Sequence, residues 1–404
     1  MGMSIEQLRK LVHDGVAVRG TATLEPAGGP SDKVFPPTHS VKDGEARYAF
    51  EKRRIKGTEV PCVVLDSVQS QANRMEEALQ ALWADKRLAL PVISVDLRKV
   101  APELGFVTSL TAPHRVADAL LRDSMLDGTL FRLSAIGKSF TDATIRDASQ
   151  LFKVCPTALV FGIWDSTGPK GGMGAKFARA LVSEIVGINA VHGVKTSSRI
   201  DPTGIVTKAA ELYESKNRDE GWTLDASAAR LDAKNKPVKY GKDGKVSEAN
   251  HSNIPPSIDE LAGGVTIDHA EHTVVLSLAG LRKLGFGGAD VAARTVLAAL
   301  GLVGVLAAQA RGHDLRSRCL LVPRKGNALK LSAVDLRGET TDFELDLEQA
   351  IKLYDEAVAA LPEALRFAQK AGEPLATLVP SEKLAHLITE SRKLAAAGAD
   401  LEGE

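Results

Sequence analysis

Three basic residues on a glycine-rich stretch of the chain are suited to binding phosphate. Lys170, Lys176 and Arg179 lie within residues 168–179, a stretch that has four glycines and no acidic residue. Glycine lets the backbone approach a ligand closely, and the lysines and the arginine add full positive charges. This stretch is therefore the first candidate site for an anion.

The elements expected around this loop would direct it at the anion. Residues 157–164 are apolar and β-favouring, which predicts a buried strand, and residues 175–187 place apolar side chains on one face of a predicted helix. A helix that begins directly after the loop would offer unpaired N–H groups and the positive end of its dipole. We therefore expect residues 156–201 to form one contact point for phosphate.

A second group of polar residues stands where a strand predicted to end at residue 66 passes into a helix that ends near residue 83. The group is Ser67, Gln69, Ser70, Asn73 and Arg74. Ser67 or Ser70 could simply cap the helix, which is the more economical interpretation of either serine alone. Capping does not explain the amides and the arginine on the same turn, whereas contacts to ribose and phosphate would.

His114 and Arg115 open a helix predicted over residues 111–123. His114 and Asp118 have the four-residue spacing of metal ligands, but no third ligand lies nearby and Arg115 would oppose a cation. We expect His114 to cap, pack or touch phosphate, and we expect no metal site and no cofactor.

Further candidates for backbone contacts lie on two strands. Lys195, Ser198 and Arg199 belong to a run in which hydroxyls and basic residues alternate, and Arg19 lies on a strand predicted over residues 15–24. Such a run is also typical of a polar edge strand.

The remaining catalytic signals are weak. The glycine loop lacks the Gly-Lys-Ser/Thr of a P-loop, and no G-x-G-x-x-G follows a strand. Asp66, Asp118, Asp165 and Asp201 end predicted elements and could converge on a metal, which keeps a metal-dependent phosphodiesterase as an alternative. Aromatic residues make up only 4% of the chain, so base stacking is not indicated.

Composition indicates a soluble α+β protein in a reducing cytoplasm. The 404 residues are 44% hydrophobic and 25% charged, and the three cysteines are scattered in apolar contexts. The apolar run 296–310 is shorter than a bilayer span and predicts a buried helix rather than a membrane contact. Strands and helices alternate irregularly, which favours α+β over a regular parallel sheet.

Zero net charge conceals an uneven distribution. Residues 339–404 have 14 acidic and 6 basic residues, so residues 1–338 have 37 acidic and 45 basic residues. We expect a basic body at 1–338, a charged insertion at 215–256 within it, and an acidic helical segment at 339–404 packed on or appended to the body. The basic body is compatible with a polyanionic partner.

Five long polar blocks resemble those of a known family: LDSVQSQANRMEEAL, TAPHRVADALLRDS, PTALVFGIWDSTGPKGGMGAKFARALVSEIVG, TSSRIDP and NHSNIPPSIDELAGGVT. In this order they resemble the RAMP-superfamily backbone protein of type I-G (formerly type I-U) CRISPR effectors, the Cas-seven-type subunit of a Cascade-like complex. The resemblance runs from about residue 19 to about residue 323.

The resemblance implies a fold and a role. The implied fold is a modified RRM, or ferredoxin-like, palm with large insertions, and segment 215–256 would be a thumb-like hairpin or a flexible insertion. The implied role is that of a non-catalytic subunit that polymerises head to tail along CRISPR RNA. Its partners would be that RNA, target DNA paired with the guide, other copies of itself, the large subunit and the crRNA-processing or capping subunit. The candidate residues above would then bind RNA.

Overall fold

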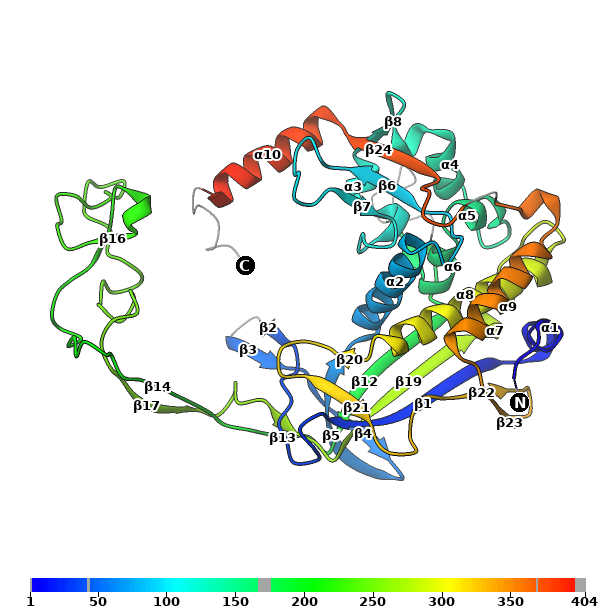
Figure 1. Cartoon of the computed structure of the whole chain (residues 1–404), viewed down its shortest axis with the longest axis horizontal. Helices are drawn as coiled ribbons and strands as arrows, with labels where there is room; N and C mark the ends of the chain where they lie inside the picture. The colour runs from blue at the N-terminus through cyan, green and yellow to red at the C-terminus, as the bar shows by residue number, and fades with distance from the viewer. Residues whose placement is uncertain (1, 42–43, 166–175, 368–369, 397–404) are drawn as a thin grey trace.

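The computed structural model describes residues 2–41, 44–165, 176–367 and 370–396. Within these residues, nine strands form one large sheet in which neighbouring strands are antiparallel. Its main order is β20–β21–β1–β19–β12–β5–β4, and β22 pairs with both β1 and β23 (Figure 1). The strands are β1 (Ala17–Pro26), β4 (Phe50–Ile55), β5 (Thr58–Asp66), β12 (Leu181–Ile188), β19 (His269–Ser277), β20 (His313–Asp314), β21 (Leu320–Pro323), β22 (Lys330–Val334) and β23 (Thr340–Phe343).

One face of this sheet is covered by helices. Along β1 the buried Val18 and Leu24 alternate in direction with the exposed Arg19, as expected when only one face of a strand packs against a core. Two long helices, α2 (Val68–Ala84) and α8 (Asp290–Ala310), lie side by side over the buried face. Two more helices, α9 (Leu347–Ala359) and α1 (Ile5–Asp14), pack against α8.

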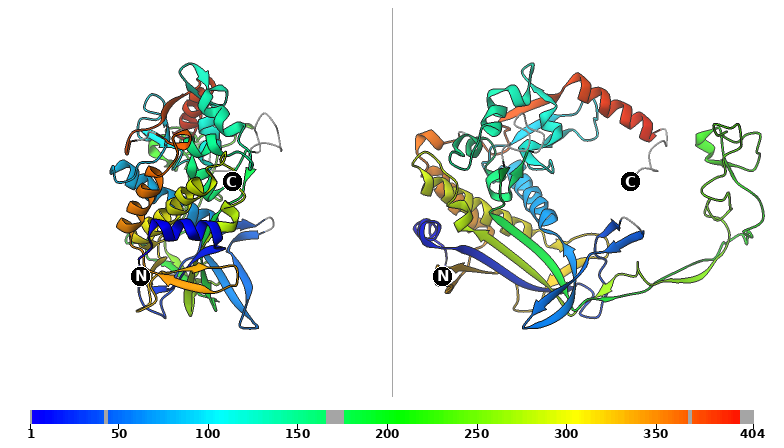
Figure 2. Two further views of the ribbon diagram at one scale, coloured as in Figure 1. Left: turned by 90° about the vertical axis from the view of Figure 1, so that its right-hand side faces the viewer. Right: turned by 180° about the vertical axis from the view of Figure 1, so that it is seen from behind.

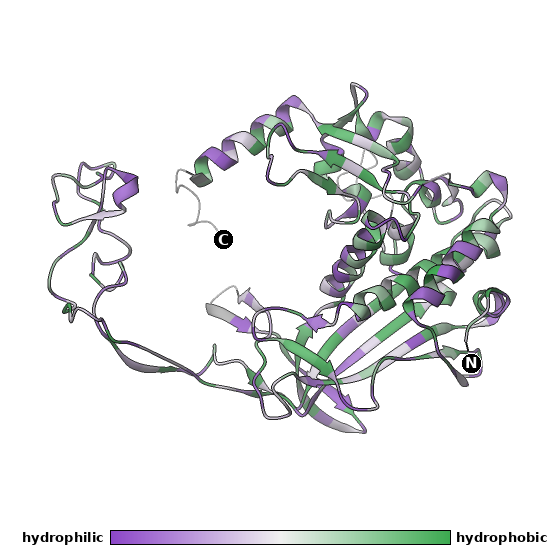
Figure 3. Cartoon of the chain, in the orientation of Figure 1, coloured by the Kyte–Doolittle hydropathy of each residue, from purple (hydrophilic) through white to green (hydrophobic). Residues whose placement is uncertain are grey.

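Helix α8 is the apolar centre of the protein. It is long and apolar enough to cross a membrane, but most of its residues are buried against α2, α9 and the sheet. Apolar residues accordingly concentrate in α8 and in the central strands (Figure 3). The predicted buried helix over residues 296–310 is therefore confirmed.

The chain order of the central elements is β1, α2, β12, β19, α8 and β21, whereas their order in the sheet is β21–β1–β19–β12. The helices α2 and α8 thus lie on the crossovers between strands that run parallel to each other but are not adjacent. The predicted α+β class is confirmed, since antiparallel strands and helices are segregated into layers.

A smaller sheet stands above the helices and includes a strand from near the C-terminus. Its order is β7–β6–β24–β8–β9, with β24 parallel to β6 and antiparallel to β8. The strands are β6 (Ile93–Asp96), β7 (Phe106–Thr108), β8 (Ser124–Leu126), β9 (Thr129–Leu130) and β24 (Ala376–Pro380), and α10 (Glu382–Ala396) follows. The acidic C-terminal segment is thus joined to the body through β23, α9 and β24.

A long arm leaves the central sheet and carries residues 200–253 away from the body (Figures 1 and 2). Its shaft is the antiparallel pair β14 (Lys195–Arg199) and β17 (Ile254–Asp259), and every residue of β17 is exposed. The predicted insertion 215–256 lies within this arm. The arm's base and tip contain β13 (Val191–His192), β18 (Val265–Thr266), β15 (Tyr213–Glu214), η4 (Arg218–Glu220) and β16 (Trp222–Thr223).

Two predicted elements beside the glycine-rich loop are wrong. Residues 157–164 were expected to be a strand, but they form α6 (Pro156–Phe161), which begins with proline and is followed by Gly162 at φ 80°. Residues 175–187 were expected to be a helix, but they contain β11 (Lys176–Phe177) and the start of β12. Short, fully buried apolar runs do not show by periodicity which structure they form. No helix N-terminus follows residue 175, so that part of the anion-site argument fails.

A further difference is the interruption of a predicted helix. The helix expected over 111–123 is divided at Asp118, where the backbone is extended (φ −59°, ψ 143°) and the side chain caps the second piece. The short elements of this region are η1 (Arg115–Ala117), α3 (Ala119–Arg122), η2 (Phe131–Leu133), α4 (Ala135–Thr141), α5 (Ser149–Val154) and β10 (Ile163–Trp164). Elsewhere lie β2 (Thr38–Val41), β3 (Gly44–Tyr48), α7 (Leu278–Leu281) and η5 (Glu363–Leu365).

The packing of α8 predicts that Gly304→Ala stabilises the protein. A Cβ at this position would lie 3.5 Å from Phe161 Cζ and 3.6 Å from Met75 Cβ, which are ordinary contacts. Because alanine also has the higher helix propensity, we expect the free energy of unfolding to rise by up to about 1 kcal/mol in urea denaturation. Gly304→Leu, the control, should overpack the same site and destabilise. A loss of stability in Gly304→Ala would show that this part of the core is tighter than described.

Candidate functional site

A buried carboxylate organises the strand-to-helix junction that the sequence singled out. Asp66, the last residue of β5, is fully buried. Its oxygens accept hydrogen bonds from Ser70 Oγ at 2.8 Å, Gln71 Nε2 at 2.7 Å, Arg74 Nε at 2.9 Å and Arg316 Nη2 at 3.2 Å. Two guanidinium groups thus neutralise this carboxylate, and β5, α2 and the β20–β21 turn are held together at one point.

Several predicted RNA-binding residues of this junction have structural partners. Ser67 is the N-cap of α2 and accepts from the Ser70 N–H at 3.3 Å, which confirms the capping interpretation for Ser67. Ser70 and Arg74 are bound to Asp66 and Arg74 also donates to backbone carbonyls of the β20–β21 turn. Gln69 and Asn73 are exposed on the outer side of α2. They keep their predicted role without a competing structural one.

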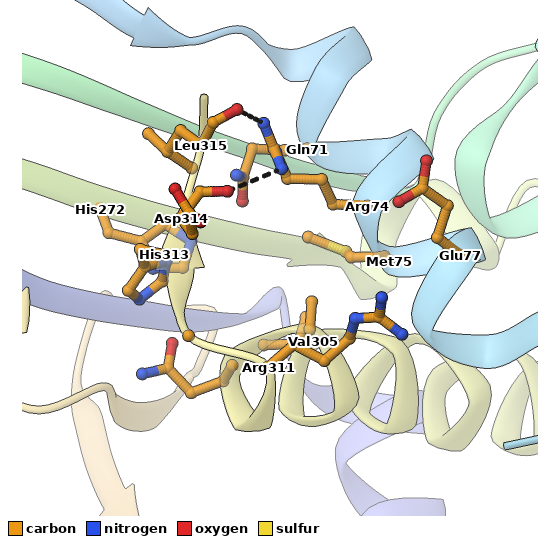
Figure 4. A pocket seen from close by; sticks show the side chains of 13 residues that line it. Gln71, Arg74, Met75, Glu77, His272, Val305, Arg311, His313, Asp314 and Leu315 are labelled. Carbon is orange, nitrogen blue, oxygen red and sulfur yellow. Dashed lines mark hydrogen bonds between the residues drawn. The ribbon is translucent and has the colours of Figure 1, made fainter. Parts of the chain in front are cut away.

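A polar cavity of about 220 Å³ lies beside this junction, between α2, the end of α8 and β20 (Figure 4). His272, Gln309 and His313 contribute to its lining, and the rings of the two histidines pack edge to face with centroids 5.2 Å apart. Burial lowers the pKa of His272 to about 3 and also lowers the pKa of His313. Both imidazoles are therefore neutral at physiological pH.

Arg115 is buried and serves the protein itself. Its Nε and Nη2 each lie 2.6 Å from a carboxylate oxygen of Glu76, and its Nη1 donates to the carbonyl of Gly162 at 3.0 Å. Burial raises the pKa of Glu76 to about 7, against the lowering effect of Arg115. A guanidinium held in this way is poorly placed for a phosphate. The predicted RNA contact of Arg115 is therefore not supported by its geometry.

Exposed basic and aromatic groups lie together on the outer side of Arg115. Lys176 Nζ stands 5.3 Å from the ring centroid of Trp164, whose side chain is 60% exposed. Arg179 is partly exposed, and burial together with the charge of Arg115 lowers its pKa. His114 is exposed, with Nδ1 3.5 Å from Asp118 Oδ2. Lys170 lies outside the described residues.

The candidate residues on the arm have different roles. Lys195 and Ser198 are exposed on β14. The guanidinium of Arg199 donates to the carbonyls of His251 and Ser252 and to Asn250 Oδ1, so Arg199 fastens the root of the arm's tip. Arg19 is exposed on the sheet face that carries no helix. The structure thus places the thirteen predicted residues that it describes in four separate places rather than one.

The candidate metal ligands do not converge. Within the described parts of the chain, no group of three His, Cys, Asp or Glu side chains is arranged to hold a metal. Asp165, like Asp66, is buried and accepts a hydrogen bond from an arginine, with Arg132 Nη2 2.7 Å from its Oδ1. Asp201 accepts from Thr203 and Ser252 and orders the arm's root.

Sequence reasoning predicted neither the cavity lined by His272, Gln309 and His313 nor a role for Trp164. The three cavity residues come from β19, α8 and β20 and meet only through the fold, so no local pattern could have found them. Trp164 offered a signal, since a tryptophan directly before a polar, basic loop is a candidate for a surface contact.

Residues 18–192 match the protein family described as CRISPR-associated protein GSU0053. This match confirms the CRISPR-associated resemblance seen in the sequence. Among solved structures, the crystal structure of Thermofilum pendens Csc2 aligns with 98% of this chain and 81% of that chain, at a TM-score of 0.27 and 11% identity. No curated protein sequence matches the chain.

The Glu76–Arg115 pair predicts a pH-dependent stability change. Arg115→Met leaves the Glu76 carboxylate buried without its cation, which costs about 3–5 kcal/mol when that carboxylate is charged. The folded-state pKa of Glu76 then rises above its parent value of about 7, so the folded variant holds a proton that the unfolded chain loses. Its stability therefore continues to fall with rising pH above 7, where that of the parent has levelled off.

Urea denaturation of parent and variant on both sides of this pH checks the prediction. The double variant Glu76→Gln/Arg115→Met has no carboxyl group to titrate, and its stability difference from the parent should not widen above pH 7. An equal widening in the double variant would mean that another group is responsible.

Proposed function

We propose that the protein is a non-catalytic backbone subunit of a type I-G, Cascade-like complex, because residues 18–192 match the family described as CRISPR-associated protein GSU0053. It binds CRISPR RNA and assembles head to tail along it. The family match carries this proposal, since it covers β1, α2 and the junction around Arg115. Guide–target base pairing reads the DNA sequence, so the subunit needs contacts mainly to the guide backbone.

The central sheet supports a modified RRM, or ferredoxin-like, palm. The order β21–β1–β19–β12, with α2 and α8 on the crossovers, is that of a β-α-β-β-α-β unit. In this view β5 and β4 extend the sheet at one edge, the arm is an insertion, and the smaller sheet combines inserted strands with β24 of the C-terminal segment. The fold then leaves one sheet face without helices, with Arg19 on it.

The arm supports an assembly partner. Large apolar side chains on it are strongly exposed: Ile200 at 86%, Ile258 at 69% and Val206 at 65%. Such residues on a protruding segment mark a surface that another molecule covers. A neighbouring copy would use a different surface to receive the arm, which is the geometry of a head-to-tail filament. The large subunit and the crRNA-processing or capping subunit would bind elsewhere, and the complex would work in the cytoplasm.

The phosphodiesterase alternative has less support. It requires Asp66 or Asp165 to ligate a metal, but both carboxylates are buried and bound by arginines. An arginine at a carboxylate opposes a cation there.

Purification with and without a CRISPR array tests the proposal. We expect RNA to co-purify with the protein, to become discrete and guide-sized when an array is co-expressed, and to be released by high salt. The measurements are the absorbance ratio of the protein and the length of the extracted RNA. A protein that neither carries RNA nor binds it at low salt would refute the proposal. Metal-dependent RNA cleavage abolished by Asp66→Ala would favour the alternative.

Salt-dependent binding identifies the backbone contacts. Lys176→Ala and Lys195→Ala each remove an exposed charge, so each should weaken binding to single-stranded RNA of any sequence. The slope of log affinity against log salt should fall by about 0.7 for each contact that is lost. Lys352→Ala, an equivalent change on the exposed side of α9, is the control. Slopes equal to that of Lys352→Ala would show that neither lysine touches RNA.

A further inference from the structure

The cavity beside Asp66 contains polar atoms that the described residues leave without partners. His272 Nδ1, His313 Nε2 and Gln309 Oε1 are buried, and none of the three has a hydrogen-bond partner within the described chain. The two histidines are only 4% and 6% exposed. Buried polar atoms are costly to leave unpaired, so something that enters the cavity must bind them.

A chain of hydrogen bonds fixes what His272 offers to the cavity. The Asp66 carboxylate can only accept, so Gln71 presents Nε2 to it at 2.7 Å and turns Oε1 towards β12. Ser183 Oγ donates its proton to that Oε1 at 2.9 Å and must therefore accept from His272 Nε2, also at 2.9 Å. With its proton on Nε2, the neutral imidazole has a bare lone pair on Nδ1. Together with Gln309 Oε1, it requires hydrogen-bond donors.

The rim of the cavity carries both signs of charge, and Arg311 is its cation for an anionic group of the ligand. Arg74 and Arg311 line it from α2 and from the end of α8, and Glu77 and Asp314 are the acidic residues of the lining (Figure 4). Arg74 already serves Asp66, whereas Arg311 is exposed. A metal is poorly matched to this place, since two arginines oppose a cation and the two imidazoles have no third ligand of the usual types in the described chain.

We propose that this cavity binds a ribose of an RNA strand, with the 2′-hydroxyl donating to His272 Nδ1 or Gln309 Oε1 and the adjoining phosphate near Arg311. This inference rests on the proposed RNA binding and adds to it a means of distinguishing RNA from DNA. A cavity of about 220 Å³ holds far more than the single water that could also satisfy one lone pair. Deoxyribose would fill the space and leave the acceptors unpaired.

The test compares sugars at constant sequence. Fluorescence anisotropy is measured with the full chain and one labelled single-stranded sequence made as RNA, as 2′-fluoro RNA and as DNA. The 2′-fluoro strand keeps the size and pucker of the sugar but removes the donor. We expect the parent to bind RNA about tenfold more tightly than the 2′-fluoro strand. Equal affinities in the parent overturn the proposal that the cavity binds the ribose of an RNA strand, whereas no binding of any strand overturns the proposed function itself.

Variants assign the effect to the cavity. Gln309→Met keeps the length of the side chain on α8 but removes the Oε1 acceptor. His272→Phe removes the lone pair of Nδ1. Each should reduce the ratio of RNA to 2′-fluoro affinity towards one. Gln150→Met makes the same chemical change on the exposed side of α5 and should leave the ratio unchanged. A melting curve confirms that each variant is folded.

Three further outcomes are decisive. An unchanged ratio in folded Gln309→Met and His272→Phe overturns the assignment of the ribose to this cavity. Zinc that co-purifies in equal amount with the parent and is lost in His272→Phe overturns the ribose itself. Thermal stabilisation by AMP but not by 2′-deoxy-AMP, with no preference among strands, would show that the cavity binds the ribose of a free nucleotide. It would overturn the proposal that this ribose belongs to an RNA strand.

Discussion

The buried carboxylate of Asp66 is the interaction on which the central architecture depends. Through Ser70, Gln71 and Arg74 it holds the first turns of α2, and through Arg316 it holds the turn between β20 and β21. Gln71 extends the same network to Ser183 on β12 and His272 on β19. An isolated buried anion would be strongly unfavourable. The elements that donate to this one must therefore assemble together or not at all, and the cavity beside it is a product of that assembly.

Much of the fold could be predicted from local sequence, but only where local signals were unambiguous. Strand β1 alternates buried and exposed residues, and α2 begins with a serine cap, so both were predicted near their observed bounds. Residues 157–161 were misjudged because all of them are buried, which leaves no polar face to reveal the period. In β12 the β-branched residues and the polar Ser183 between apolar neighbours favour a strand. The apolar residues would also fall on one face of a helix, which is why a helix was predicted.

The candidate site shows a second limit of sequence reasoning. Arginines were expected to face a nucleic acid, yet Arg74, Arg115 and Arg199 donate to carboxylates and carbonyls of the protein. Two of these arginines have partners that are distant in the chain: Arg115 reaches Glu76 across 39 positions, and Arg199 reaches Ser252 across 53. A single sequence shows charge but not which charge is already neutralised. Lys176 and Lys195 are exposed and remain the better candidates for phosphate.

The position of β24 has a consequence for how the protein is made. Ala376 pairs with Ile93, and Val379 pairs with Met125, so the middle strand of the smaller sheet is synthesised long after its neighbours. Until then β6 and β8 have open edges, and neither can complete its hydrogen bonding. Such distant pairing slows folding and exposes intermediates to aggregation. If synthesis stops before β24 is made, the released chain has its smaller sheet divided into two parts. The open edges of β6 and β8 are then the first sites that the cell's quality-control machinery would recognise.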